Sequence, residues 1–236
     1  MRSRERQELK ATKVIAIDGP SASGKGSTSR ELARRLGYLH VDTGAMYRAL
    51  TWHCQRLGVI PADTEGREFA AAESAAVARV CGEWPVRLVV DGGHLRVAVA
   101  GHLPDEELRG PVVTSYVARV SHVPEVRAWM LDFQRGCAEF GSLVMDGRDI
   151  GTRIFPGTPF KFFLTAREEV RKARGENEGH GGGVARRDSI DQDLNQPAAD
   201  AVLVDTSDRS VAAVVDWVLG LIRERERRGD AAVATG

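Results

Sequence analysis

The stretch Ile17-Asp18-Gly19-Pro20-Ser21-Ala22-Ser23-Gly24-Lys25-Gly26-Ser27 joins a short apolar run, Val14 to Ile17, to a helical pattern that begins near Lys25. Gly19 and Gly24-Lys25 hold the G-x-x-x-x-G-K spacing. In a loop of that form, backbone N–H groups turn inward around phosphate oxygens and the lysine ammonium reaches the outer phosphates. The helix that follows adds the positive end of its dipole. We therefore predict that this loop binds the phosphates of a nucleotide through Gly19, Pro20, Ser21, Ala22, Ser23, Gly24, Lys25, Gly26 and Ser27. A glycine-rich turn that binds nothing is the alternative.

Five apolar runs alternate with helical patterns along the chain. Short apolar runs that end in turn residues are typical of buried parallel strands. Crossovers between parallel strands are right-handed, so the alternation predicts an α/β fold with a doubly wound, five-stranded parallel sheet. The predicted strands are Val14–Ile17, Tyr38–Asp42, Ser142–Asp146, Phe160–Leu164 and Ala201–Asp205.

Apolar residues at helical spacing predict the helices between these strands. The first covers 25–36, and Thr43 is predicted to cap a second over 43–57. Pro124 is predicted to divide a long helical region into two helices. The last helix covers 209–222, after which we expect a solvated, fraying tail.

A hairpin pattern interrupts the alternation. Val86–Val90 and His94–Val99 alternate in polarity, and Asp91-Gly92-Gly93 supplies the turn between them. Antiparallel strands do not arise from crossovers, so we predict a separate inserted subdomain. The predicted organisation is a core of 12–60 and 111–225, an insertion of 61–110, and flexible tails of 1–11 and 226–236.

Composition limits the classes of partner. The 33 lysines and arginines balance the 33 aspartates and glutamates among 236 residues, so no global field attracts nucleic acid or a membrane surface. The three cysteines are widely spaced, which predicts free thiols in a reducing cytosol. No apolar stretch approaches the roughly 18 residues that span a bilayer. The six histidines lack metal-ligand spacing, so we expect them to be structural or exposed. We predict a cytoplasmic monomer that binds small molecules.

Two further polar segments follow predicted strands. In Asp42-Thr43-Gly44-Ala45-Met46-Tyr47-Arg48, Arg48 lies four residues after Gly44 and so shares a helix face with the loop end. Asp146, Arg148 and Asp149 follow the third predicted strand. Ligands of open α/β sheets bind outside the carboxyl ends of strands, so these side chains predict a second substrate beside the phosphate loop.

The chain resembles the bacterial cytidylate kinases, a family of P-loop nucleoside monophosphate kinases, from about 14 to 220. The likeness is carried by the loop with its G-K-G-S variant, by Asp42 to Arg48, and by Asp146-Gly147-Arg148-Asp149-Ile150-Gly151-Thr152. Pro124-Glu125-Val126-Arg127 and Arg187-Asp188-Ser189-Ile190-Asp191 extend it. The resemblance implies a P-loop kinase core, an inserted α+β subdomain that binds the nucleoside monophosphate, and a short arginine-bearing lid at about 166–194.

The resemblance also implies the reaction ATP + CMP (or dCMP) → ADP + CDP (or dCDP), with Mg²⁺ near Ser27. The acceptor phosphate is mostly ionised near pH 7 because its second pKa is about 6, so no general base is needed. Positive charge would come from Lys25, Arg148, Arg174 and Arg187, the last being our first choice in the lid. The implied substrate-binding residues are Thr43, Tyr47, Arg48, Arg127, Arg148, Asp149 and Asp191.

Each of these residues has a plainer alternative outside its motif, such as a solvated charge, a helix cap or a packing residue. The chain also departs from the family pattern. Ala118 stands where a serine is usual, the lid is short, and no arginine follows Asp191 before Pro197. Two other hypotheses therefore stay open, a P-loop kinase with another acceptor and a nucleotide-binding protein with weak transfer activity. A GTPase is disfavoured because the chain has no N-K-x-D motif.

Overall fold

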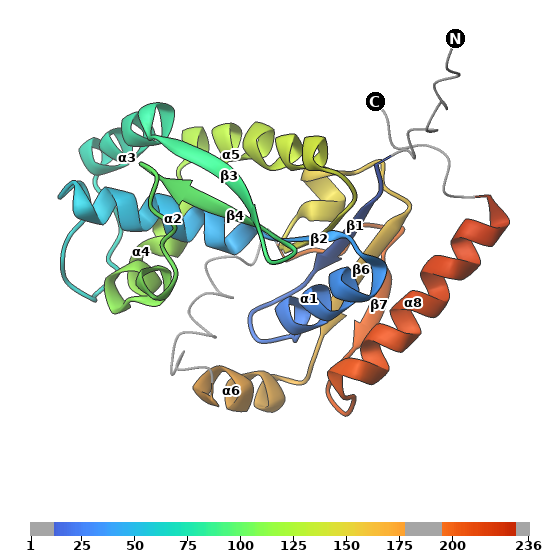
Figure 1. Cartoon of the computed structure of the whole chain (residues 1–236). Coiled ribbons are helices and arrows are strands. Elements are labelled where there is room, and N and C mark those ends of the chain that lie inside the picture. Colours follow the sequence, from blue (N-terminus) through green and yellow to red (C-terminus); the bar gives the residue numbers. More distant parts are fainter. Residues whose placement is uncertain (1–11, 178–194, 230–236) are drawn as a thin grey trace, which may run out of the picture.

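The computed structural model describes residues 12–177 and 195–229, and its centre is a seven-stranded sheet in the order β3-β4-β2-β5-β1-β6-β7 (Figure 1). All neighbouring strands are parallel except β3 and β4. The strands are β1 (Val14–Asp18), β2 (Leu39–Asp42), β3 (Val86–Asp91), β4 (His94–Val99), β5 (Leu143–Gly147), β6 (Phe160–Thr165) and β7 (Val202–Asp205).

Helices cover both faces of the sheet, which confirms the doubly wound prediction. Successive residues of β1 point to opposite faces, so Val14 and Ala16 join one apolar core while Ile15 and Ile17 join the other. The helices are α1 (Lys25–Leu36), α2 (Thr43–Arg56), α3 (Ala71–Glu83), α4 (Pro111–Ser121), α5 (Pro124–Gly136), α6 (Glu168–Asn177) and α8 (Val211–Arg228). Shorter turns are η1 (Glu106–Arg109), η2 (Cys137–Phe140) and the π-helical η3 (Ile150–Ile154).

The predicted strand count of five is wrong, because the hairpin β3–β4 joins the same sheet. His40 of β2 pairs in register with His94 of β4, and the hairpin thereby extends the edge beyond β2. The predicted turn is confirmed, with φ of 54° at Gly92 and 83° at Gly93, a conformation that favours glycine. Leu95 of β4 lies in the same core cluster as residues of α2 and α4. The division of the chain into a core and an insertion stays a prediction.

Two helix ends differ from the sequence prediction. Asp42, not Thr43, caps α2, since its carboxylate accepts from the Ala45 N–H at 3.0 Å. The last helix continues beyond 222 to Arg228, and near its end Glu226 accepts from Lys13 Nζ at 2.6 Å. The break at Pro124 is confirmed. Within the described residues, no helix is long and apolar enough to span a membrane.

Candidate active site

The loop between β1 and α1 has the backbone geometry of a phosphate cradle. Gly19 and Gly24 adopt φ of 150° and 87°, and a Cβ at Gly19 would lie 2.1 Å from the Leu164 carbonyl oxygen. Only glycine fits at position 19. Lys25 folds over the loop, where its Nζ donates to the Pro20 carbonyl at 2.9 Å. The loop thus presents the N-terminal end of α1, with a lysine beside it, to any anion in the adjoining cavity.

Asp18, directly before the loop, ties it to the segment after β5. Its two carboxylate oxygens accept from the backbone N–H groups of Ile150 and Gly151, both at 2.8 Å. Burial raises the pKa of Asp18 to about 6, against the lowering effect of these two hydrogen bonds. Sequence reasoning gave Asp18 no role, because its partners lie 132 and 133 residues away. Its only local signal is a carboxylate at the end of a buried strand.

The raised pKa of Asp18 gives a testable slope of stability against pH. The folded state holds this proton to a higher pH than the unfolded state, so the free energy of unfolding falls as pH rises from about 4 through about 6. Compared with Asp18→Asn, which cannot titrate, the wild type should lose about 2 kcal/mol between pH 4.5 and 7. Urea unfolding of both proteins at each pH measures this. Asp132→Asn, on the exposed side of α5, is the matched control. A pH-independent difference between wild type and Asp18→Asn would contradict the buried carboxylate.

Arg148 joins the phosphate loop to the end of β5. Its guanidinium donates to the Gly19 carbonyl at 3.0 Å, to Ser21 Oγ at 2.8 Å and to Asn195 Oδ1 at 3.3 Å. Arg171 of α6 reaches the same loop by donating to the Ser21 carbonyl at 3.2 Å. Two arginines therefore border the phosphate loop.

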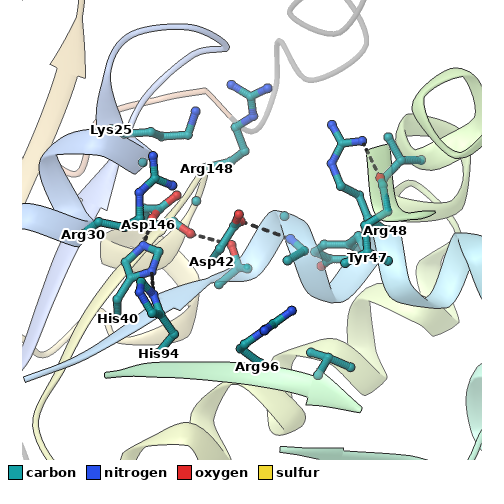
Figure 2. Close-up of a pocket in the computed structure, with 18 of the residues that line it drawn as sticks. Lys25, Arg30, His40, Asp42, Tyr47, Arg48, His94, Arg96, Asp146 and Arg148 are labelled. Carbon is teal, nitrogen blue, oxygen red and sulfur yellow. Dashed lines mark hydrogen bonds and ion pairs between the residues drawn. The ribbon is translucent and has the colours of Figure 1, made fainter. Parts of the chain in front are cut away.

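The wall opposite the loop is built on α2. Figure 2 shows Lys25 and Arg148 on one side of the cavity and Tyr47 and Arg48 on the other. The Arg48 guanidinium donates to the Leu108 carbonyl at 3.2 Å, which holds it beside η1. Burial raises the pKa of Tyr47 to about 12, so its hydroxyl stays protonated near neutral pH and can donate a hydrogen bond. Thr43 Oγ1 donates to the Asp146 carbonyl at 2.8 Å and fastens α2 to β5.

Arg127 and Asp149, 22 residues apart, meet in an ion pair at the far end of the cavity. Both side chains are largely buried, and they combine a guanidinium donor with a carboxylate acceptor in one place. Ala118 lines the same cavity, and so does Ser121, about one turn further along α4. A hydroxyl is therefore present in this corner although position 118 has none.

One cavity of about 710 Å³ is lined by residues of the phosphate loop, of α2 and of the segment after β5, and by the Arg127–Asp149 pair. The predicted site residues that line it are Ser21, Ala22, Gly24, Lys25, Gly26, Ser27, Thr43, Tyr47, Arg48, Arg127, Arg148 and Asp149. Gly19, Pro20 and Ser23 belong to the loop but not to the cavity lining. Arg187 and Asp191 lie outside the described residues.

Arg174 contacts the phosphate loop indirectly, through Thr206, on the side away from the cavity. It donates to Thr206 Oγ1 at 3.0 Å and to the Thr206 carbonyl at 2.8 Å, and Thr206 Oγ1 in turn donates to the Ser23 carbonyl at 2.8 Å. Arg174 does not line the cavity. Its catalytic role stays a prediction.

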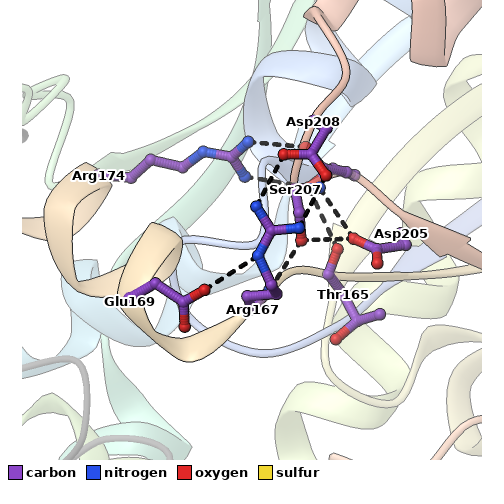
Figure 3. A network of polar contacts seen from close by, with 8 residues as sticks. Thr165, Arg167, Glu169, Arg174, Asp205, Ser207 and Asp208 are labelled. Carbon is purple, nitrogen blue, oxygen red and sulfur yellow. Dashed lines mark hydrogen bonds and ion pairs between the residues drawn. The ribbon is translucent and has the colours of Figure 1, made fainter.

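A polar network that the sequence did not predict lies beside Arg174, between the start of α6 and the turn after β7 (Figure 3). Arg167 binds both carboxylate oxygens of Asp208 at 2.7 Å and donates from Nε to Glu169 at 2.9 Å. Ser207 donates from its hydroxyl to Asp205 at 2.6 Å. The network joins the start of α6 to the turn between β7 and α8.

Acidic and imidazole side chains form the floor of the cavity. Desolvation at the cavity wall and the neighbouring Asp146 carboxylate raise the pKa of Asp42, although part of the residue is exposed. His40 Nε2 lies 2.7 Å from Asp146 Oδ2, and His40 Nδ1 lies 3.0 Å from His94 Nδ1. All four residues line the cavity. The sequence placed Asp146 at this edge but gave the histidines only a structural or exposed place.

Known proteins match this chain along nearly all of its length. The family model for cytidylate kinases matches residues 15–224. A cytidylate kinase of Mycolicibacterium paratuberculosis is 40% identical over 228 residues, which are 90% of this chain and 96% of that protein. One of Corynebacterium glutamicum is 38% identical over 233 residues, 92% of this chain and 97% of that protein. One of Mycobacterium leprae is 40% identical over 228 residues, 90% of this chain and 96% of that protein. The chain therefore belongs to the cytidylate kinase family.

Proposed function

We propose that this protein transfers the γ-phosphoryl group of ATP to CMP or dCMP and so forms ADP and CDP or dCDP. The observation that carries the proposal is the single cavity, which joins the phosphate loop to Arg48, Arg148 and the Arg127–Asp149 pair. The names of the relatives agree with this reaction and do not favour an altered acceptor or a protein without transfer activity.

The residues of the cavity are suited to phosphoryl transfer by positioning and charge. The loop N–H groups and Lys25 would hold the ATP phosphates, while Arg48 and Arg148 would hold the acceptor phosphate in line with them. Negative charge on the transferring group would be stabilised by Lys25 and Arg148. Because the acceptor phosphate is mostly ionised, no residue has to remove a proton.

The Arg127–Asp149 pair is suited to the edge of cytosine. The carboxylate of Asp149 can accept from the 4-amino group, and the guanidinium of Arg127 can donate to the ring acceptors. Tyr47 and Thr43 would complete the wall, and Asp191 would meet the ribose hydroxyls. Arg127 and Asp149 form an ion pair in the absence of a nucleotide. Each side chain therefore holds the other in position before the substrate binds.

Mg²⁺ fits the donor set at the loop. Among the described residues, no three His, Cys, Asp or Glu side chains gather into a cage for a metal ion. Mg²⁺ usually keeps several waters and binds one or two protein groups together with substrate phosphates, so a cage is not needed. The Ser27 hydroxyl at the start of α1 would be the protein ligand. When bound with ATP, the ion supplies charge neutralisation on the phosphate oxygens.

A panel of acceptors tests the reaction. With Mg-ATP, we expect CMP and dCMP to exceed UMP and AMP by at least about 10²-fold in kcat/KM, because a site built to pair with a polar group rejects one that it cannot pair. ADP formation in a coupled assay measures this. Similar turnover of all four acceptors would contradict the assignment of the base corner, and tight binding of CMP and ATP without CDP would favour a protein that only binds nucleotides.

Asp149→Asn sharpens the same test. An amide both donates and accepts, so it can face the uracil carbonyl as well as the cytosine amino group. The variant should therefore lose most of the preference for CMP over UMP while it keeps its ATP affinity.

We further infer that the enzyme acts as a monomer in the cytoplasm, which gel filtration and cell fractionation would check.

A further inference from the structure

A buried hydrogen bond joins β2 to β5 under the cavity. His40 and Asp146 are 5% and 4% exposed, and the distance between His40 Nε2 and Asp146 Oδ2 is 2.7 Å. An ionised carboxylate can only accept, so the hydrogen lies on His40 Nε2. This contact holds the Asp146 carboxylate in one orientation near the end of β5, the strand that Arg148 directly follows.

The other nitrogen of His40 contacts the hairpin. His40 Nδ1 and His94 Nδ1 are 3.0 Å apart, and the two rings meet edge to face at 89°. The two Nδ1 atoms share one hydrogen, which either His94 donates to His40 or His40 donates to His94, and in both cases the bond links the two rings. Burial and nearby cations, among them Arg30, lower the pKa of His94, which favours a neutral His94 ring.

The same two residues carry the backbone link between the hairpin and the sheet. His40 and His94 are the register pair of β2 and β4, and the His40 N–H donates to the Gly93 carbonyl at 3.0 Å. By contrast, β2 and β5 pair over four residues, from Leu39 to Asp42. The hairpin therefore pairs with β2 at a single register position, and the side chains of the two residues at this position, His40 and His94, contact each other.

This point separates two groups of cavity residues. Asp91, His94 and Arg96 line the cavity from the hairpin, whereas Asp146 and Arg148 line it from the end of β5. Figure 2 shows His40 between His94 and Asp146. A change in the histidine contacts would alter the spacing of the two walls without removing any residue that would hold a phosphate.

We propose that His40 and His94 are positioning residues, which hold the hairpin wall of the acceptor site against the end of β5 and fix the orientation of Asp146. The inference rests on the proposed CMP kinase activity, where the hairpin forms part of the site for the acceptor. It gives the two histidines a role that their spacing in the sequence did not indicate.

The first test compares two substitutions of His94. Leucine keeps the bulk but can neither donate nor accept, whereas asparagine places an amide that can do both near the position of Nδ1. His94→Leu should raise KM for CMP about three- to tenfold, the range expected for one lost hydrogen bond, with kcat and KM for ATP nearly unchanged. His94→Asn should restore KM to within about twofold. Val90→Thr, on the exposed side of the hairpin, is the control for altered hairpin stability.

The second test separates the two bonds of His40. His40→Gln keeps a donor near the position of Nε2, so it should retain kcat and raise only KM for CMP. His40→Leu loses both bonds and should lower kcat as well, by about tenfold, because Asp146 then lacks its partner. Equal effects of His94→Leu and His94→Asn would assign the pair a packing role only, and an unchanged kcat in His40→Leu would overturn the orientation of Asp146.

A readout without substrate keeps this inference apart from the proposed reaction. The exchange of the His40 amide hydrogen, which is bonded to Gly93, should be faster in His94→Leu than in His94→Asn or the wild type. If the wild type failed to phosphorylate CMP while this order held, the proposed reaction would be wrong and the coupling of hairpin to sheet would stand. Equal exchange in all three proteins would overturn the coupling.

Discussion

Lys25→Met is expected to lower kcat with CMP by about 10²- to 10³-fold, the usual cost of removing one group that stabilises developing charge in a closed site. Methionine has nearly the length of lysine, so the substitution removes the ammonium and little of the packing. The Lys25 Nζ donates to the Pro20 carbonyl at a partly buried position, and the loss of that hydrogen bond should cost the fold about 1 kcal/mol. Initial rates at saturating ATP and CMP measure the effect.

Lys13→Met is the matched control for this variant. Lys13 stands at the start of β1, the opposite end of the strand from the loop, and it pairs with Glu226 in a half-exposed ion pair. Pairs of this kind contribute at most about 1 kcal/mol, so kcat should be unchanged. A Lys25→Met enzyme with more than about a tenth of wild-type kcat would show that Lys25 does not stabilise the transferring phosphate.

The parts of the fold that local residues determine could be predicted. Gly19 and Gly24 need backbone conformations that the G-x-x-x-x-G-K spacing encodes, and the strand that precedes them was predicted to within one residue. Pro124 begins a helix because proline fits the first turn and no later one. Asp91-Gly92-Gly93 forms the predicted turn for the same kind of reason.

Contacts between distant segments could not be predicted in this way. The hairpin was predicted, but its place in the sheet depends on one pair, His40 and His94, which no local pattern marks. The cap of α2 shows the same limit at short range. Thr43 and Asp42 are both good capping residues. Asp42 caps the helix, because the Thr43 hydroxyl is hydrogen-bonded to the Asp146 carbonyl of β5 instead.

The site followed the same division. The residues of the cavity were predicted through motifs, but their mutual contacts were not. Arg127 and Asp149 were expected to face a base and were found to face each other as well. Asp18 was missed because its role consists of two hydrogen bonds to backbone groups more than a hundred residues later. A motif gives the type of residue, whereas only the fold gives its partner.

Arg148 is the residue for which the contacts change the expectation most. From the sequence, Arg148→Ala should weaken the use of CMP and largely spare the binding of ATP. In the structure the guanidinium also donates to Gly19 and Ser21, so it supports the phosphate loop itself. We therefore expect Arg148→Ala to lower kcat/KM for CMP by about 10³-fold or more and to weaken ATP binding several-fold as well.

Arg148→Lys separates charge from geometry in this prediction. Lysine keeps the positive charge but lacks the planar guanidinium, whose separate N–H groups can bind the loop and a phosphate at the same time. The variant should therefore recover ATP affinity only in part and remain at least about tenfold below wild type in kcat/KM for CMP. Calorimetry with ATP and steady-state rates with CMP measure the two effects. Arg153→Ala, an exposed arginine of η3, is the matched control and should change neither. If Arg148→Ala left ATP affinity intact, the guanidinium would serve only the acceptor, and its bonds to the loop would be incidental to binding.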